Sequence, residues 1–165
     1  MTANALPLDT IDGHQLLALL VGSWQGTTRT WFEPGSLADE TPTKGRFRSI
    51  LGGRFVQHEY QGQLQSVPLE GTAIYGFDPA RNCFESSWVD TAHMGSTMMF
   101  SQGTRSSNGF WVLGSYADPG GGPNWCWRTV IEIISSDQIA IRAYNITPEG
   151  QEDLAVETIY HRAAD

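Results

Sequence analysis

From Ser23 onward, apolar and polar residues alternate along the chain with a period of two. Such alternation, with β-branched and aromatic residues enriched, is typical of strands that bury one face. About ten such runs occur, and clusters of Gly, Pro, Asn or Asp separate them as turns do. The runs cover approximately residues 23–33, 43–51, 54–62, 70–78, 83–91, 96–104, 109–117, 124–134, 138–146 and 152–162.

One segment near the N-terminus has a helical pattern instead. The leucines of residues 16–20 share one broad stripe, Asp9 or Asp12 can cap the helix, and Gly22 can end it. Because the strands that follow are joined without a crossover helix, the pattern predicts an antiparallel meander. A meander of this length closes on itself to avoid two exposed edges. We therefore predict an all-β closed barrel of about ten strands with a short N-terminal helix.

Two connections stand out among the predicted turns. Residues 34–44 form the longest polar stretch between strands, and residues 118–123 are rich in glycine. Each is either an ordinary surface loop or a mouth loop that opens for a ligand.

Composition narrows the function classes. The 165 residues fit one domain, 1–165, with the barrel at about 22–162. Ten Lys and Arg against eighteen Asp and Glu give a net charge of −8, which disfavours nucleic acids and anionic membranes as partners. Charged residues are only 17% of the chain, while 18 glycines and six tryptophans indicate a β-rich, ligand-facing protein.

The sequence lacks the motifs of several common kinds of functional site. Cys83 and Cys126 are far apart, so we expect free thiols and no metal site. No phosphate-binding loop, zinc motif or nucleophile elbow occurs, so the sequence offers no ready-made catalytic motif. The only apolar run is too short for a membrane span or signal peptide, and we expect a cytoplasmic protein.

A short helix followed by Gly22-Ser23-Trp24 resembles the G-x-W signature of lipocalins and other calycins. The last predicted strand ends in Tyr160-His161-Arg162, and the resemblance implies that Arg162 lies across Trp24 and closes one end of the barrel. The stretches ILGGRF (50–55), PLEG (68–71), YGFD (75–78) and WVD (88–90) are similar to an uncharacterised bacterial lipocalin-like family, a domain of unknown function. The resemblance covers most of residues 20–162 and implies a barrel with a cavity, but no activity.

Turn geometry predicts which side chains point inward. A two-residue turn at 52–53 places His58 and Tyr60 on one face and pairs Arg46 with Glu59 on the other. Because an ion pair belongs in water, His58 and Tyr60 face the interior.

The alternation of side chains between the two faces of a strand assigns the inward residues of later strands in the same way. A turn at 79–82 leaves Tyr75, Trp88 and Asp90 on the drier face. After Asn124, the face with Trp127 is the interior. Pairing Ile134 with Ile139 then places Tyr144 inside as well, opposite Thr129.

Met98 and Phe100 share a face and complete the expected wall. The aromatic faces and few polar groups suit a small hydrophobic or aromatic ligand, while the alternative is that these side chains simply fill the barrel. The candidate ligand-binding residues are His58, Tyr60, Tyr75, Trp88, Asp90, Met98, Phe100, Trp127 and Tyr144.

Catalysis is an alternative to ligand binding as the role of these residues. His58 is a candidate partner for the buried Asp90, and with Tyr60 nearby the pair can serve acid–base chemistry on a small organic molecule. With no nucleophile in view, we favour binding over catalysis. His93 lies in a glycine-flanked loop, where a solvated histidine is the simpler expectation.

A haem-binding barrel and an interaction module are also compatible with the sequence. Nitrobindins, ten-stranded barrels of this superfamily, hold haem through a histidine near the last strand. His161 has a comparable place, but it points to solvent if Arg162 packs under Trp24. His58 can serve as an axial ligand instead, with Met98 or Met99 as the second. Outward-facing Trp31 and Trp111 would suit a homodimer interface.

Overall fold

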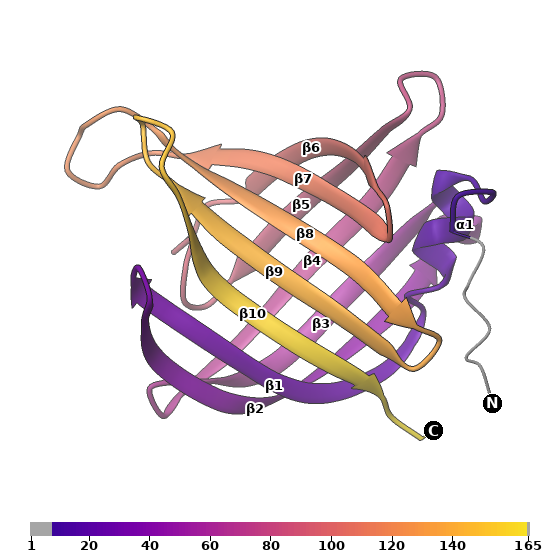
Figure 1. The fold of residues 1–165 in the computed structure, drawn as a ribbon, viewed down its shortest axis with the longest axis horizontal. Coiled ribbons are helices and arrows are strands. Elements are labelled where there is room, and N and C mark those ends of the chain that lie inside the picture. The colour runs from indigo at the N-terminus through magenta and orange to yellow at the C-terminus, as the bar shows by residue number, and fades with distance from the viewer. Residues whose placement is uncertain (1–7, 165) are drawn as a thin grey trace.

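A computed structural model of the protein describes residues 8–164 and shows ten strands in a closed barrel with a short helix at one end (Figure 1). This confirms the predicted all-β architecture. The elements are α1 (Gly13–Ala18), β1 (Gly22–Glu33), β2 (Ser36–Ile50), the 3-10 turn η1 (Leu51–Gly53), β3 (Phe55–Leu64), β4 (Val67–Asp78), β5 (Cys83–Asp90), β6 (Met99–Ser106), β7 (Gly109–Tyr116), β8 (Trp125–Ser135), β9 (Gln138–Ile146) and β10 (Glu152–Arg162).

Each strand pairs in antiparallel fashion with its neighbours along the chain, and β1 pairs with β10 to close the barrel. The closing ladder runs from Trp24 opposite Arg162 to Thr30 opposite Val156. Closure leaves no unpaired sheet edge, as expected for a meander of this length. Among the described residues, no helix is both long and apolar enough to cross a membrane.

The polar stretch 34–44 is not a loop, so that prediction was wrong. Strand β2 begins at Ser36, and only the turn at 34–35 separates it from β1. Its polar residues belong to a strand because the outward ones find cross-strand partners, as Glu40 does with Arg29. The inward ones are threonines, Thr41 and Thr43, whose hydroxyls bond backbone carbonyls of β3.

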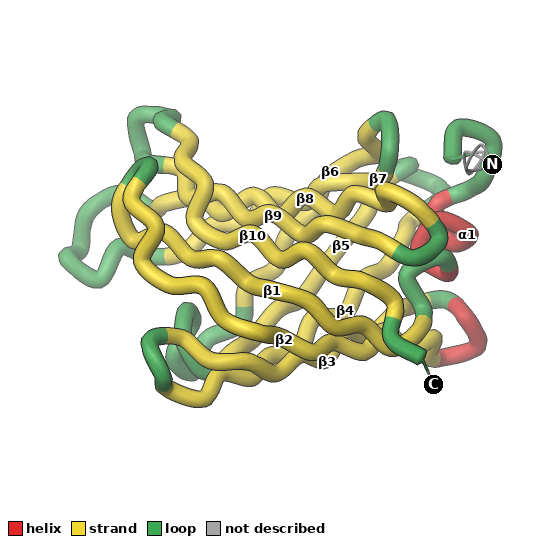
Figure 2. The backbone as a smooth tube through the Cα atoms, turned by 60° about the horizontal axis from the view of Figure 1, so that its bottom comes forward, coloured by secondary structure: helices red, strands yellow, loops and turns green. Residues whose placement is uncertain are grey.

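Helix α1 fills one end of the barrel. Asp12 caps it, accepting a bond from the backbone N–H of Gln15, whose side chain bonds back to the Asp12 N–H. The leucines at 16, 17 and 20 are fully buried and join the main core. Helix α1 and the turn η1 lie at the same end, while the loops after β1, β5, β7 and β9 gather at the other (Figure 2).

Arg162 ties this helical end to the first strand. Its guanidinium lies 4.2 Å from the Trp24 ring centre and donates to the carbonyl oxygens of Val21 (2.8 Å) and Leu19 (3.2 Å). The indole N–H of Trp24 donates to the carbonyl of Leu20 at 2.8 Å. These contacts satisfy carbonyls at the end of α1 that the helix cannot satisfy itself.

The register of β2 against β3 follows the prediction, with Phe47 opposite His58. The connection is longer than the predicted two-residue turn, because residues 51–54, including η1, lie between the paired strands. The lengthening adds one residue to each side, so the inward face is unchanged. The predicted Arg46–Glu59 ion pair is wrong, since Glu59 pairs diagonally with Arg48 at 3.0 Å.

The inward face predicted for the end of β9 was wrong. An irregularity between Ile133 and Ser135 pairs Ile133 with Ile139, so Tyr144 lies opposite Arg128 on the outer face. There the Arg128 guanidinium stacks on the Tyr144 ring at 4.7 Å. A one-residue slip of this kind turns every following side chain to the other face.

In β6 the inward residue is Met99 rather than Met98 or Phe100. Met99 is opposite Trp88 and buried, whereas Met98 precedes the strand and Phe100 is 70% exposed. The connection 91–98 is eight residues long, so it does not fix the register as a two-residue hairpin turn does, and this is why parity failed here.

The outer surface also differs from the expected tryptophan patch. Trp31 and Trp111 are only partly exposed. The strongly exposed apolar side chains lie elsewhere, and the largest exposures belong to Leu51, Phe100, Val67 and Phe32.

Candidate functional site

The barrel interior holds a partly enclosed cavity of about 110 Å³. One wall is hydroxylic and comes from β1, β2 and β10, where Thr28, Thr30, Thr41, Thr43 and Thr158 line it. The opposite wall is aromatic and comes from β3, β4, β5 and β8, with Tyr60, Tyr75, Trp88 and Trp127. The cavity is therefore lined by threonine hydroxyls on one side and by aromatic rings on the other.

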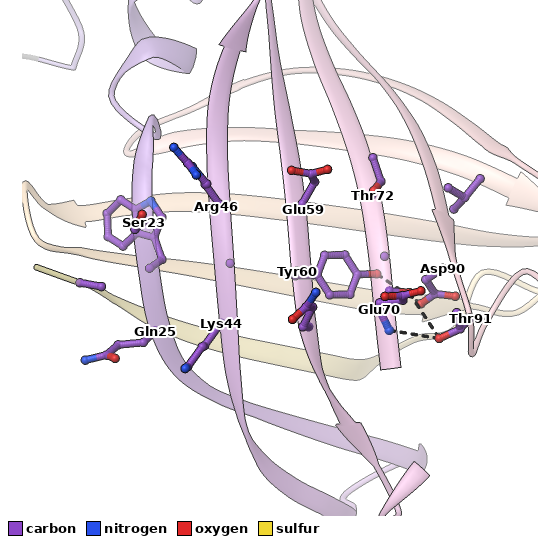
Figure 3. Close-up of a pocket in the computed structure, with 16 residues that line it drawn as sticks. Ser23, Gln25, Lys44, Arg46, Glu59, Tyr60, Glu70, Thr72, Asp90 and Thr91 are labelled. Atoms are coloured by element: carbon purple, nitrogen blue, oxygen red, sulfur yellow. Dashed lines mark hydrogen bonds between the residues drawn. The ribbon is translucent and has the colours of Figure 1, made fainter. Parts of the chain in front are cut away.

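A larger hollow lies on the outside of β1–β5, but it is open to solvent (Figure 3). Polar and charged side chains line it, and Glu59 there is already paired with Arg48. Tyr60 and Asp90 reach it from behind, where Figure 3 shows the hydrogen bond between them. The inner cavity is more enclosed and partly aromatic, so it is the better ligand site, because it removes more of a ligand's surface from water.

Four side chains along the cavity form one hydrogen-bonded chain. The indole N–H of Trp88 donates to the hydroxyl of Tyr60 at 2.8 Å, and that hydroxyl donates to Oδ2 of Asp90 at 3.3 Å. Asp90 also accepts from Nδ1 of His93 at 2.5 Å. The strands position the chain, since Tyr60 lies opposite Gly71, and Gly71 lies opposite Asp90.

The loop after β5 turns back on Asp90 and holds His93 in place. Oδ1 of Asp90 accepts from the backbone N–H groups of Ala92 (3.1 Å) and His93 (2.6 Å). The His93 ring lies 5.6 Å from the Trp88 ring and 5.7 Å from that of Trp127, centre to centre. The two indoles are themselves stacked, 5.7 Å apart and 17° from parallel.

The surroundings of the titratable groups in the cavity shift their pKa values in different directions. Burial by itself raises the pKa of Asp90, but the hydrogen bonds and charge of His93, with the backbone N–H donors, outweigh burial and lower it. Burial, and next the charge of Asp90, raise the pKa of Tyr60. Burial also raises the pKa of Tyr75. The site at neutral pH thus holds one carboxylate among protonated phenols.

His58 lies inside the barrel but does not pair with Asp90, as had been expected. Its ring stacks on Phe47 at 4.0 Å, and Nε2 is 3.4 Å from the hydroxyl of Tyr160. Burial lowers the pKa of His58 to about 3, so the imidazole is neutral. The partner of Asp90 is His93, three residues further along the chain, and an acid–base pair of His58 with Asp90 is not formed.

Six of the nine candidate residues line the cavity, and three do not. His58, Tyr60, Tyr75, Trp88, Asp90 and Trp127 line it, whereas Met98, Phe100 and Tyr144 do not. The site also contains residues that sequence reasoning missed, above all His93 and the threonines. The threonines carry a visible signal, since they alternate along β1 and β2. His93 carries none, because its position depends on how the 91–98 loop folds.

Two of the residues proposed for haem, His58 and Met99, line the cavity, but the remaining geometry does not suit haem. His161 is exposed on the outer face, His58 is bonded to Tyr160, and Met98 lies outside the wall. A cavity of about 110 Å³ is also much smaller than a porphyrin. Within residues 8–164, no three His, Cys, Asp or Glu side chains are grouped to hold a metal ion, and Cys83 and Cys126 are free.

Several solved structures have a fold similar to that of this chain. Rv2717c from M. tuberculosis has a similar structure, with a TM-score of 0.64, 16% identity, and coverage of 91% of this chain and 96% of that one. The S-type phycobiliprotein lyase CPES from Guillardia theta has a TM-score of 0.62, 10% identity, and coverage of 94% and 95%. A redesigned β-barrel has a TM-score of 0.51 at 11% identity, covering 93% of this chain and 100% of the design.

At such identities these likenesses concern the fold alone. No curated protein matches the chain in sequence. Residues 10–162, nearly the whole barrel with its helix, match the family described as "Protein of unknown function (DUF1579)". The chain therefore belongs to the DUF1579 family and has a closed antiparallel barrel of ten strands.

Proposed function

We propose that the protein reversibly binds a small, single-ring organic molecule inside the barrel. The observation that carries this proposal is the partly enclosed cavity with one aromatic wall and one hydroxylic wall. A tightly filled core would bury the same aromatic residues but leave no such space. The polar groups are also fixed in place by hydrogen bonds to one another, as a site that orients a ligand requires.

The size of the cavity restricts the ligand. At about 110 Å³ it is well below the ~300 Å³ of sites for drug-sized molecules. An apolar cavity of roughly 150 Å³ in another protein accepts benzene. We therefore propose a ligand of about one ring, smaller than the broad hydrophobic class expected from the sequence.

Toluene tests the proposal without assuming the natural ligand. Saturating toluene should raise the thermal midpoint of unfolding, because a ligand that binds only the folded state stabilises it. The substitution Ala143→Leu should abolish this shift, since Ala143 lines the cavity beside Met99 and Trp127. The control Ile74→Ala changes a partly exposed residue on the outer face and should retain the shift. An equal toluene shift in the Ala143→Leu variant would place binding outside the cavity and contradict the proposal.

A further inference from the structure

The loop histidine, His93, indicates the chemical class of the ligand, provided that the function proposed above is correct. Its two ring nitrogens have different surroundings. Nδ1 is held by the carboxylate of Asp90 at 2.5 Å. Nε2 has no hydrogen-bond partner among the described residues, although the ring lines the cavity. One nitrogen is thus held in place, and the other remains for a ligand.

The carboxylate fixes which nitrogen of a neutral imidazole carries the proton. Asp90 is ionised and has a fully buried side chain, so its oxygens act only as acceptors. Nδ1 must then donate, and Nε2 of a neutral imidazole becomes an acceptor. The backbone bonds from Ala92 and His93 to Asp90 fix the loop itself. When the imidazole is neutral, the cavity therefore presents a preoriented hydrogen-bond acceptor beside the stacked indoles.

The charges around the cavity determine which donor suits this acceptor. No Lys or Arg is among the described residues that line the cavity, so an anionic ligand would have no counter-ion there. The oxygens of Asp90 already accept four hydrogen bonds, from the backbone, His93 and Tyr60, so a ligand cation would not find a free carboxylate oxygen to contact. A neutral O–H on an aromatic ring satisfies the acceptor without burying a new charge.

We propose that the ligand is a single-ring aromatic alcohol of the phenol class, its ring against the Trp88–Trp127 wall and its hydroxyl donating to Nε2 of His93. The threonine wall then meets any second polar substituent on the far side of the ring. In this arrangement His93 determines the specificity of the site, and Asp90 is the positioning residue that orients it.

Four probes of similar size separate the ligand classes: phenol, toluene, benzoate and benzylamine. Their dissociation constants can be measured by the fluorescence of the stacked indoles at neutral pH. We expect phenol to bind about 10-fold more tightly than toluene, in line with one added hydrogen bond in a desolvated site. Benzoate and benzylamine should bind more weakly than phenol. Tighter binding of either ion than of phenol would overturn the inference.

The substitution His93→Phe keeps a ring at the same place and removes the acceptor. The ratio of phenol to toluene affinity should fall about 10-fold in this variant, mainly through phenol, while toluene still binds. Asp90→Asn should lower the ratio less, because the imidazole is retained but no longer oriented by charge. The matched control is His161→Phe, which changes an exposed histidine of β10 and should leave the ratio unchanged.

A second measurement on the unsubstituted protein does not depend on the variants folding. Phenol should shift the ¹⁵N resonance of His93 Nε2, the atom that accepts the new bond, and leave those of His161 unchanged. If toluene and phenol bind with equal affinity and no Nε2 shift occurs, the phenol inference is wrong while the binding function stands. If neither compound binds, both the inference and the proposed function fail.

Discussion

At the scale of single residues, two histidines of the same barrel have opposite roles because of their neighbours. His58 is stacked on Phe47 in a dry interior, and burial lowers its pKa to about 3. His93 is held by a carboxylate at the cavity wall. The first imidazole is neutral and packs within the core, while the second lines the cavity, where we propose that it binds a ligand. Side-chain identity alone does not distinguish them.

The buried imidazole predicts a specific pH dependence of stability. Since the unfolded pKa is about 6.5 and the folded pKa of His58 is about 3, the unfolded chain binds the extra proton across this interval. The contribution of His58 to the free energy of unfolding is fully present above about pH 6.5. It falls by about 1.4 kcal/mol per pH unit as the pH drops toward 3. His58→Phe should remove this slope, leaving the variant about 2 kcal/mol less acid-sensitive between pH 6.5 and 5.

Urea unfolding of both proteins at several pH values between 4 and 7 measures the effect. His161→Asn provides the control, because His161 is exposed and its substitution should preserve the slope. Equal slopes for the wild-type protein and the His58→Phe variant would show that some other group causes the acid sensitivity.

Gly71 is a residue whose small size the site requires. A methyl group there would come within 2.2 Å of the Tyr60 ring, which lies across it from β3. Gly71→Ala should therefore displace Tyr60, weaken its bond to Asp90 and destabilise the protein by about 1–3 kcal/mol. Gly62→Ala is a milder comparison on the neighbouring strand, with its nearest atom at 3.3 Å. Equal unfolding free energies for the two variants would contradict this account.

At the scale of elements, the sequence predicts strands well and registers only where turns are tight. The β4–β5 register followed from the turn at 79–82, and Phe77 does lie opposite Phe84. The faces of Met98 and Tyr144 could not be predicted, because the 91–98 loop and the irregularity at Ile133 shift the chain by one residue. Such a shift depends on tertiary packing, and alternation within one strand carries no record of it.

The same limit explains why part of the site was missed. The inward positions of Trp88 and Asp90 follow from strand parity. His93 belongs to a loop whose conformation is set by hydrogen bonds to Asp90, and local sequence does not specify such bonds. The cavity volume depends on how all the inner side chains pack, which no single strand determines.

Arg162 couples two elements, helix α1 and the β1–β10 seam, and its substitution tests that coupling. Arg162→Lys keeps the charge but loses the planar group that stacks on Trp24 and reaches two carbonyls at once. We expect a loss of about 2 kcal/mol in unfolding free energy, the size of one or two charged hydrogen bonds. The substitution should increase the rate of amide hydrogen exchange more in α1 than in β6–β7. A uniform change across the barrel would contradict the proposed coupling.

At the scale of the whole molecule, the closed barrel combines a well-filled end with an incompletely filled middle. The helical end contains the leucines of α1, Trp24 and Phe47, all buried. The cavity lies beyond them and lowers the stability of the fold, by about 2.6 kcal/mol for 110 Å³ at ~24 cal/mol per Å³. A filled core would be more stable, so retention of the space is the pattern expected of a binding site that trades stability for function.

Filling the space tests this trade directly. Ala143→Leu adds three carbons where Ala143 lines the cavity beside Met99 and Trp127. If the space is available to a ligand, the variant should gain about 1 kcal/mol in unfolding free energy and lose toluene binding at the same time. Ala18→Leu adds the same carbons at an exposed helix position and should leave toluene binding unchanged. Urea unfolding with and without toluene gives both quantities. A destabilised variant that still binds toluene would show that the inner side chains already use this space for packing.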